Sequence, residues 1–259
     1  MRSIPENNLS YPVQIKFDNG SSGSGFNFYF NNFLFFVTAK HVLVNESNNL
    51  HGKTGNLTAY SPEISDETPT VLEIDFDGLM LQGNIILHPD KDVAVMKIGE
   101  VFKKDDKISF KLFPEIKFVS KSNKGIVWTS EETIVKYESV LVGNDVIIFG
   151  YPSSIGMQTS PQFDYNRPLL RKGIIASKYK KANTIILDCP VYYGNSGGPA
   201  IQIEEDKGKN FFKVIGVISQ FVPYVENWIN TKNKVTNTTV LNSGYSVAVS
   251  IDSVIEIMK

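Results

Sequence analysis

The stretch Gly194-Asn195-Ser196-Gly197-Gly198 surrounds one serine hydroxyl with glycines, and this setting can serve nucleophilic chemistry. Glycine accepts a positive φ and a close approach of the backbone, which a tight turn requires. An oxyanion hole built from backbone N–H groups requires the same freedom. A serine hydroxyl is a poor nucleophile until a neighbouring base removes its proton. Ser196 is therefore a candidate nucleophile only if the chain also supplies a base and an acid.

Histidine is the usual base because its pKa lies near neutrality. The chain has three histidines: His41, His51 and His88. His41 follows the apolar run FLFFVTA at 33–39, so we expect its ring at the end of a buried strand. His51 lies in a polar turn, where we expect it to be solvated, and His88 precedes a proline, where we expect a structural role. His41 is the candidate base, and a core histidine bonded to a carbonyl is the alternative.

The acid must orient the imidazole and stabilise its charged form. Asp92 directly precedes the apolar run VAVMKI and is preferred to Asp90, which follows a proline as turn residues do. All the histidines precede Ser196, which excludes the order of the α/β-hydrolase elbow: serine, acid, histidine. The subtilisin order needs an upstream aspartate, but only Asp18 precedes His41 and the α/β context is missing. The order that remains is histidine, aspartate, serine.

The elements that must position these residues are short and rich in β-formers. Runs of such residues are bounded by Gly, Asn, Asp or Pro, and helical periodicity is scarce. This spacing predicts an all-β sandwich or barrel, with one amphipathic helix at 251–259. The charged segment 102–125 separates two strand-rich halves. We expect two domains: residues 1–110 with His41 and Asp92, and residues 111–259 with Ser196.

The bulk composition narrows the class of protein. The chain has 259 residues, 42% of them hydrophobic, and a net charge of -1, so nothing indicates nucleic acid or an anionic membrane as a partner. The histidines lack HExxH spacing and one cysteine, Cys189, cannot build a cluster, so we expect neither a metal nor another cofactor. One cysteine forms no intrachain disulfide, and the N-terminus has no signal-peptide core. We therefore expect a cytoplasmic protein.

Three stretches together resemble the chymotrypsin-like serine peptidases, especially the bacterial trypsin-like and HtrA/Deg-type branch. GSGF at 23–26 followed by FVTAKHV is similar to the family's approach to the catalytic histidine. HPDKDVAVMKI is similar to its aspartate loop, and DCPVYYGNSGGPAI to its nucleophile loop. The resemblance covers residues 11–257 and implies two six-stranded antiparallel β-barrels with the active site in the cleft between them.

The resemblance also implies a role for each candidate. Ser196 would attack the scissile carbonyl, His41 would carry the proton, and Asp92 would fix the imidazole. The N–H groups of Gly194 and Ser196 would form the oxyanion hole, with Asn195 between them. The implied activity is that of a serine endopeptidase, which hydrolyses a protein or peptide substrate through an acyl-enzyme.

Specificity follows from the same resemblance. The primary pocket would have Pro190 and Val191 at its base instead of an acid, so we expect an uncharged, apolar substrate residue on the acyl side. The residues implied to bind substrate are Pro190, Val191, Tyr192, Tyr193, Ser219, Gln220 and Phe221.

Two features depart from the family pattern. Asn195 stands where the digestive peptidases have an aspartate that pairs with a new N-terminus, so we expect no activation clip of that kind. The chain ends at Lys259, so we expect no PDZ domain. Activity would then be set by substrate, by an activating protein partner or by loop ordering. The alternative is a latent or inactive peptidase-fold module that binds a partner, since a flipped Gly194 amide would silence an intact triad.

Overall fold

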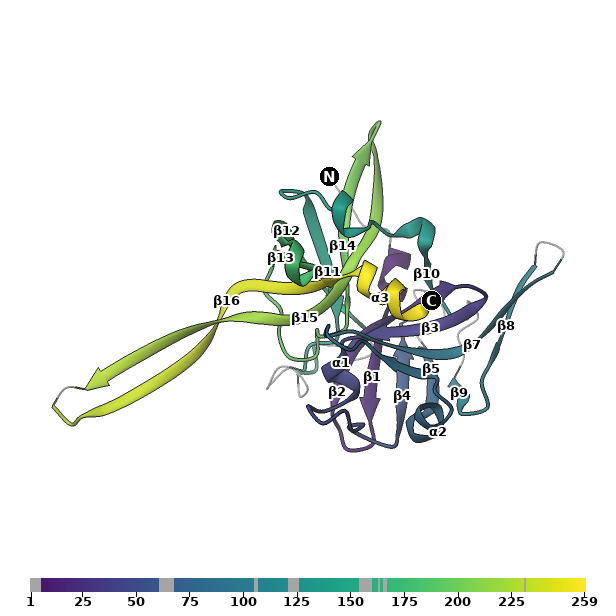
Figure 1. The fold of residues 1–259 in the computed structure, drawn as a ribbon, viewed down its shortest axis with the longest axis horizontal. Coiled ribbons are helices and arrows are strands. Elements are labelled where there is room, and N and C mark those ends of the chain that lie inside the picture. Colours follow the sequence, from purple (N-terminus) through teal and green to yellow (C-terminus); the bar gives the residue numbers. More distant parts are fainter. Residues whose placement is uncertain are drawn as a thin grey trace.

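The computed structural model shows a chain built mostly of β-strands, in two halves, with a short helix at the C-terminus (Figure 1). The structure describes residues 6–60, 68–104, 107–120, 126–153, 160–162, 164, 167–230 and 232–259. The second half is a closed barrel of six strands. The first half is a sheet of ten strands, larger than the expected six because short strands and a hairpin extend its edges. The all-β class and the terminal helix are confirmed.

The first half contains ten strands, two short α-helices and a 3-10 turn. The strands are β1 (Pro12–Phe17), β2 (Ser22–Phe30), β3 (Phe33–Thr38), β4 (Thr54–Ala59), β5 (Thr70–Asp75), β6 (Ile85–Leu87), β7 (Ala94–Lys104), β8 (Lys107–Leu112), β9 (Ile116–Ser120) and β10 (Thr129–Ser130). The helices are η1 (Glu6–Ser10), α1 (Lys40–Leu43) and α2 (Phe76–Leu81). The sheet order is β6-β7-β3-β2-β1-β4-β5-β9, with β8 on β7 and β10 on β2.

The sheet extends past the boundary expected after residue 110, which falls inside β8. Strand β9 pairs with β5, and β10 pairs with β2, so residues as far as Ser130 belong to the first sheet. The charged segment 102–125 is mostly strand because these edge strands expose one face, where charges stay in water. Residues 105–106 and 121–125 of that segment lie outside the described residues.

The barrel of the second half carries two very long strands. Its elements are η2 (Glu131–Thr133), η3 (Tyr137–Ser139), β11 (Asp145–Gly150), β12 (Leu169–Tyr179), η5 (Lys180–Ala182), β13 (Thr184–Asp188), β14 (Pro199–Asp206), β15 (Lys209–Asn230), β16 (Val235–Ser250) and α3 (Ile251–Met258). The barrel closes in the order β11-β12-β13-β16-β15-β14. Strands β15 and β16, of 22 and 16 residues, continue beyond it as a ribbon that projects far from the body (Figure 1).

A buried apolar seam joins the two halves. One cluster combines Phe26 and Phe28 of the first sheet with Phe149 and Val217 of the barrel and Val254 of α3. Burying each phenylalanine contributes about 1.5–3 kcal/mol, so this shared cluster holds the halves in a fixed relation. Side chains that extend from either half therefore meet at a defined separation.

The loop between β13 and β14 reaches across this seam at Gly197. The φ of Gly197 is +87°, and a Cβ atom there would collide with the backbone oxygen of Ser24 and the hydroxyl of Thr38. The N–H of Ser24 donates to the oxygen of Ser196 at 2.9 Å. The second half can therefore bring Ser196 this close to the first sheet only because the next residue is glycine.

We predict that Gly197→Ala destabilises the protein far more than Gly143→Ala. Gly143 has a similar φ of +90° but open space where a Cβ would go, so its replacement meets only backbone strain of about 1–2 kcal/mol. Gly197→Ala adds a collision with packed atoms, worth at least about 2 kcal/mol more. Urea unfolding followed by tryptophan fluorescence measures both, and equal losses for the two variants would contradict this account.

Candidate active site

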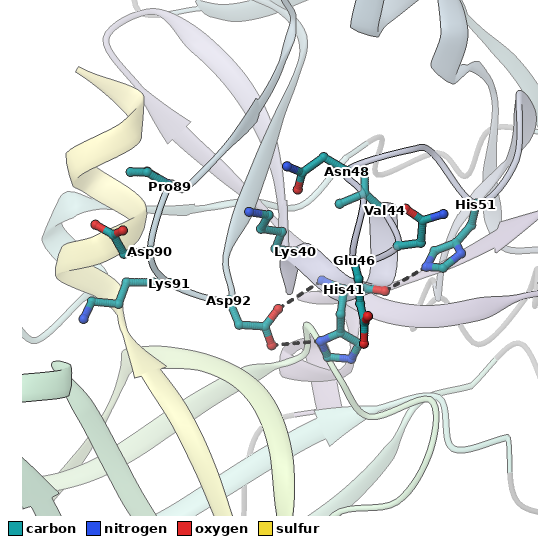
Figure 2. Close-up of a pocket in the computed structure, with 11 residues that line it drawn as sticks. Lys40, His41, Val44, Glu46, Asn48, His51, Pro89, Asp90, Lys91 and Asp92 are labelled. Carbon is teal, nitrogen blue, oxygen red and sulfur yellow. Dashed lines mark hydrogen bonds and ion pairs between the residues drawn. The ribbon is translucent and has the colours of Figure 1, made fainter.

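His41 and Asp92 lie side by side, joined by two hydrogen bonds (Figure 2). His41 is the second residue of α1, which follows the buried strand β3 closely. Its Nδ1 lies 2.8 Å from Oδ2 of Asp92, and its backbone N–H donates to Oδ1 of the same carboxylate at 3.0 Å. The carboxylate therefore fixes both the ring and the backbone of the histidine.

The bond to Asp92 determines which nitrogen of His41 can act as a base. A carboxylate only accepts hydrogen bonds, so Nδ1 carries the proton that faces it. The neutral ring then has its lone pair on Nε2. The side chain of His41 is 51% exposed, and Nε2 has no hydrogen-bond partner among the described residues. The ring is therefore oriented to accept a proton through Nε2.

The carboxyl of Asp92 is held in its ionised form. Burial alone would raise its pKa, but hydrogen bonds from His41 and Ser219 and electrostatic attraction to the His41 ring outweigh burial and lower the pKa below its ordinary value. The hydroxyl of Ser219 donates to Oδ2 of Asp92 at 2.5 Å. Since Ser219 belongs to β15, the acid contacts both halves of the molecule.

His88 shapes the loop that presents the acid. This loop joins β6 to β7, and Nδ1 of the buried His88 accepts the backbone N–H groups of Asp90 and Lys91 at 3.1 and 3.0 Å. The tight turn that results leaves Asp92, and not Asp90, bonded to His41. His88 thus occupies the structural position that the sequence indicates.

His51 differs from the solvated turn residue that the sequence suggests. Its Nε2 lies 3.0 Å from the backbone oxygen of His41 (Figure 2), and its backbone N–H donates to the oxygen of Leu43 at 3.0 Å. Its ring meets that of Phe17 edge-on, with the centroids 6.1 Å apart. His51 therefore supports the turn that carries His41, a contact that its polar sequence neighbours do not reveal.

Ser196 lies between β13 and β14 and lines the same cleft as His41 and Asp92. Its Oγ donates to the backbone oxygen of Ser219 at 3.0 Å. Within the described part of the chain, no hydrogen bond joins this hydroxyl to the ring of His41. The hydroxyl therefore rests on Ser219, and a change of rotamer about its Cα–Cβ bond would redirect it.

Two backbone N–H groups beside Ser196 are open. The oxygen of Tyr193 accepts the N–H of Ser153 at 2.8 Å, and in a trans peptide the following N–H, that of Gly194, points the opposite way. Gly194 has a φ of +91°, and a Cβ there would collide with the backbone of Tyr151. Neither the N–H of Gly194 nor that of Ser196 has an acceptor in the described ranges. Both donors are available to an anion.

Asn195 fixes the shape of this loop from inside. Its side-chain oxygen accepts the N–H of Tyr192 at 3.0 Å, while its own N–H donates to the oxygen of Tyr192 at 3.0 Å. Its backbone oxygen accepts the N–H of Gly198 at 3.0 Å. The residue is 2% exposed, so a neutral amide with partners inside the loop can be buried here without an ion pair.

A cleft of about 630 Å³ contains His41, Asp92 and Ser196 together. Six of the residues expected to bind substrate line it: Val191, Tyr192, Tyr193, Ser219, Gln220 and Phe221. Pro190, also expected there, does not line it. The rings of Tyr193 and Phe221 meet edge to face at 6.1 Å, which gives the cleft an aromatic wall.

A second hollow of about 620 Å³ adjoins the first cleft at His41 (Figure 2). It shares His41, Asp90, Lys91 and Asp92 with the first cleft and extends to Glu46 and Asn48 in the loop after α1. Space for an extended chain therefore continues from the first cleft into the second hollow.

Three further residues make contacts at the site that the sequence does not predict. The hydroxyl of Ser24 donates to the oxygen of Gly194 at 2.6 Å and so holds the Gly194–Asn195 peptide. The side-chain amide of Asn242 donates to the oxygen of Val191 at 2.6 Å. The guanidinium of Arg171 lies 4.5 Å from the ring centre of Tyr192. Each contact joins segments distant in sequence, so no local pattern marks it.

Neither a metal site nor a membrane span is apparent in the described ranges. No group of three or more His, Cys, Asp and Glu side chains there is placed to hold a metal ion. No helix in the described part of the chain is long and apolar enough to cross a membrane.

The sequence from residue 23 to residue 209 matches the family model of the trypsin-like peptidase domain. This match covers more than half of the chain, so the protein belongs to the trypsin-like peptidase family. A comparison with curated proteins found no match.

Solved structures of serine proteases share the fold. The serine endoprotease from Yersinia pestis superposes with a TM-score of 0.50 and 13% identity, over 99% of this chain and 66% of its own. The thermostable serine protease AL20 from an extremophilic microorganism superposes with a TM-score of 0.53 and 11% identity, over 96% of this chain and 95% of its own. The HtrA-type protease AlgW, solved with a tripeptide, superposes with a TM-score of 0.48 and 14% identity, and the chain spans 59% of its length. At these identities the likeness to the Yersinia pestis endoprotease and to AL20 shows the fold alone.

We predict that Asp92→Asn weakens the dependence of the unfolding free energy on pH at acidic pH. A carboxyl whose folded-state pKa lies below its unfolded value of 3.8 stabilises the fold above that value, and this stabilisation is lost as the pH falls through the folded pKa. Asparagine does not titrate, so the variant should lose less unfolding free energy than wild type between about pH 6 and pH 3. Denaturant titrations at both pH values measure the difference. Asp90→Asn, which keeps the bonded acid, should retain the wild-type slope, and an unchanged slope in Asp92→Asn would contradict the account.

Proposed function

We propose that the protein is a serine endopeptidase in which Ser196 is the nucleophile, His41 the general base and Asp92 the orienting acid. The observation that carries the proposal is the oriented His41, whose ring lines the same cleft as Ser196. In the same loop as Ser196, the N–H groups of Gly194 and Ser196 have no acceptor among the described residues. A nucleophile, a base fixed by an acid and backbone donors for an oxyanion are the parts that acyl transfer requires.

Substrate binding would engage the nucleophile. The hydroxyl of Ser196 rests on the backbone oxygen of Ser219, an acceptor at the end of an open strand edge. A substrate strand added beside residues 219–221 would offer its own N–H to that oxygen. The competing donor releases the Ser196 hydroxyl, which then turns to Nε2 of His41 and loses its proton as it attacks the scissile carbonyl.

The negative oxygen of the resulting tetrahedral intermediate would be stabilised by the N–H groups of Gly194 and Ser196. The bond from Ser153 to the oxygen of Tyr193 orients the peptide that carries the N–H of Gly194, and the bond from Ser24 to Gly194 holds the peptide between the two donors. A preorganised donor of this kind is worth about 3–4 kcal/mol of the barrier. His41 then returns the proton to the leaving amine, and water hydrolyses the acyl-enzyme by the same steps.

The cleft favours an uncharged, apolar residue on the acyl side of the cut. Val191 and Phe221 supply apolar surface, and the guanidinium held over Tyr192 opposes a second cation. The hollow beyond His41 leaves room for residues after the cut, which supports cleavage inside a chain. The substrate class is therefore an extended protein segment.

One observation supports a second candidate, a latent module that binds a peptide without cutting it. This is the hydroxyl of Ser196, which is bonded to Ser219 and not to His41. In such a module the cleft would bind an extended segment but the rotamer of Ser196 would not change. The two candidates differ in turnover and not in binding.

An assay of peptide hydrolysis distinguishes the serine endopeptidase from the latent module. Coumarin peptides with Leu, Met or Phe before the cut should be hydrolysed faster than peptides with Lys or Arg, and Ser196→Ala or His41→Ala should reduce turnover at least about a thousandfold. Ser139→Ala, an exposed serine outside the cleft, should keep the wild-type rate. Peptide binding without hydrolysis by wild type would favour the latent module, and hydrolysis unaffected by Ser196→Ala would exclude this serine as the nucleophile.

A further inference from the structure

The ribbon that projects from the barrel is formed by residues 223–230 of β15 and 235–242 of β16, here called the arm (Figure 1). The two strands pair with each other from Pro223 opposite Asn242 to Asn230 opposite Val235. Beyond the arm, β15 pairs with β14 and β16 pairs with β13, but within the described residues no strand pairs with the outer edges of the arm itself. The arm is thus a two-stranded sheet with two open edges.

Apolar side chains lie on both faces of the arm. Opposed residues of an antiparallel pair share a face, so Tyr224 and Leu241 lie on one face and Val225 and Val240 on the other. Six large apolar side chains are more than half exposed: Tyr224, Val225, Trp228, Ile229, Val235 and Val240. A two-stranded ribbon with both faces uncovered is only marginally stable in water by itself, which favours a partner along one of its edges.

The distribution of charge indicates which partner fits. Residues 235–242, VTNTTVLN, carry no charge, and five of the eight are valine or threonine, which favour strands. Residues 223–230 contain Glu226 and Pro223, and proline cannot donate a ladder hydrogen bond. Around a two-fold axis each strand meets its own copy, so any charge near the axis would face the same charge. An edge that pairs with its own copy must therefore be free of charge and able to donate hydrogen bonds. The outer edge of β16 fulfils both requirements, whereas that of β15 contains Glu226 and Pro223.

We propose that the arm is a dimerisation element in which residues 235–242 of β16 pair antiparallel with the same residues of a second copy. The two ribbons then form one four-stranded sheet across the two-fold axis. This pairing satisfies the open N–H and C=O groups of β16 and brings side chains of the two β16 strands into contact on each face of the sheet. The proposal does not depend on peptidase activity.

The mass of the full chain in solution tests the proposal. Size-exclusion chromatography with light scattering at about 50 μM should give twice 28.9 kDa for wild type, as expected for an interface of standard size. Thr238→Lys places two like charges close to the axis and should give the monomer mass. Leu81→Lys adds the same charge to an exposed position on α2 and should stay dimeric. A monomeric wild type, or a dimeric Thr238→Lys, overturns the proposal.

Cross-linking tests the pairing without changing charge. Cys189 is fully buried, and burial raises the pKa of its thiol to about 11, so an introduced cysteine is the reactive one. Thr238→Cys and Thr239→Cys lie at the middle of the paired segment, and at least one should form a disulfide-linked dimer under mild oxidation. Leu81→Cys should remain monomeric on a denaturing gel. Failure of both arm variants to cross-link, with Leu81→Cys as the baseline, overturns the pairing.

Discussion

The carboxylate of Asp92 is the group on which the geometry of the candidate site depends. It accepts two hydrogen bonds from His41 in the first half and one from Ser219 in the second. Because the backbone oxygen of Ser219 also accepts the hydroxyl of Ser196, one short chain of hydrogen bonds runs from His41 through Asp92 and Ser219 to Ser196. An ionised Asp92 fixes the tautomer of the histidine and helps to hold the strand on which the serine rests.

This chain of bonds requires the two halves to stay in register. The apolar seam between β2, β3, the barrel and α3 sets their separation, and Gly197 lets the nucleophile loop approach the first sheet. On the barrel side, Asn242 holds the wall at Val191, and it does so from the base of the arm. The apolar seam, the loop at Gly197 and the base of the arm therefore each help to position the residues that line the cleft.

The sequence was sufficient for the parts of the site that local chemistry defines. His41 at the end of a buried strand, Asp92 at the start of another and Ser196 among glycines are recognisable because each setting constrains nearby residues. The all-β class followed from short β-rich runs in the same way.

Contacts between distant segments could not be predicted. Nothing near Ser24 or Ser219 in the sequence marks the bond that each makes, and His51 was misjudged for the same reason. The arm was missed because its strands are exposed on both faces, so they lack the alternation of apolar and polar residues that indicates a half-buried strand. The ten strands of the first sheet likewise depend on edge pairings that local patterns do not encode.

Labelling by a fluorophosphonate, read by intact mass, tests the central claim most directly, because this reagent reacts far faster with an activated serine hydroxyl than with an ordinary one. The account predicts one adduct per wild-type chain, none on Ser196→Ala and strongly reduced labelling on His41→Ala. Absence of the adduct on folded wild-type protein would contradict the claim that His41 and Asp92 activate Ser196. An adduct that persists on Ser196→Ala would place the reactive serine elsewhere.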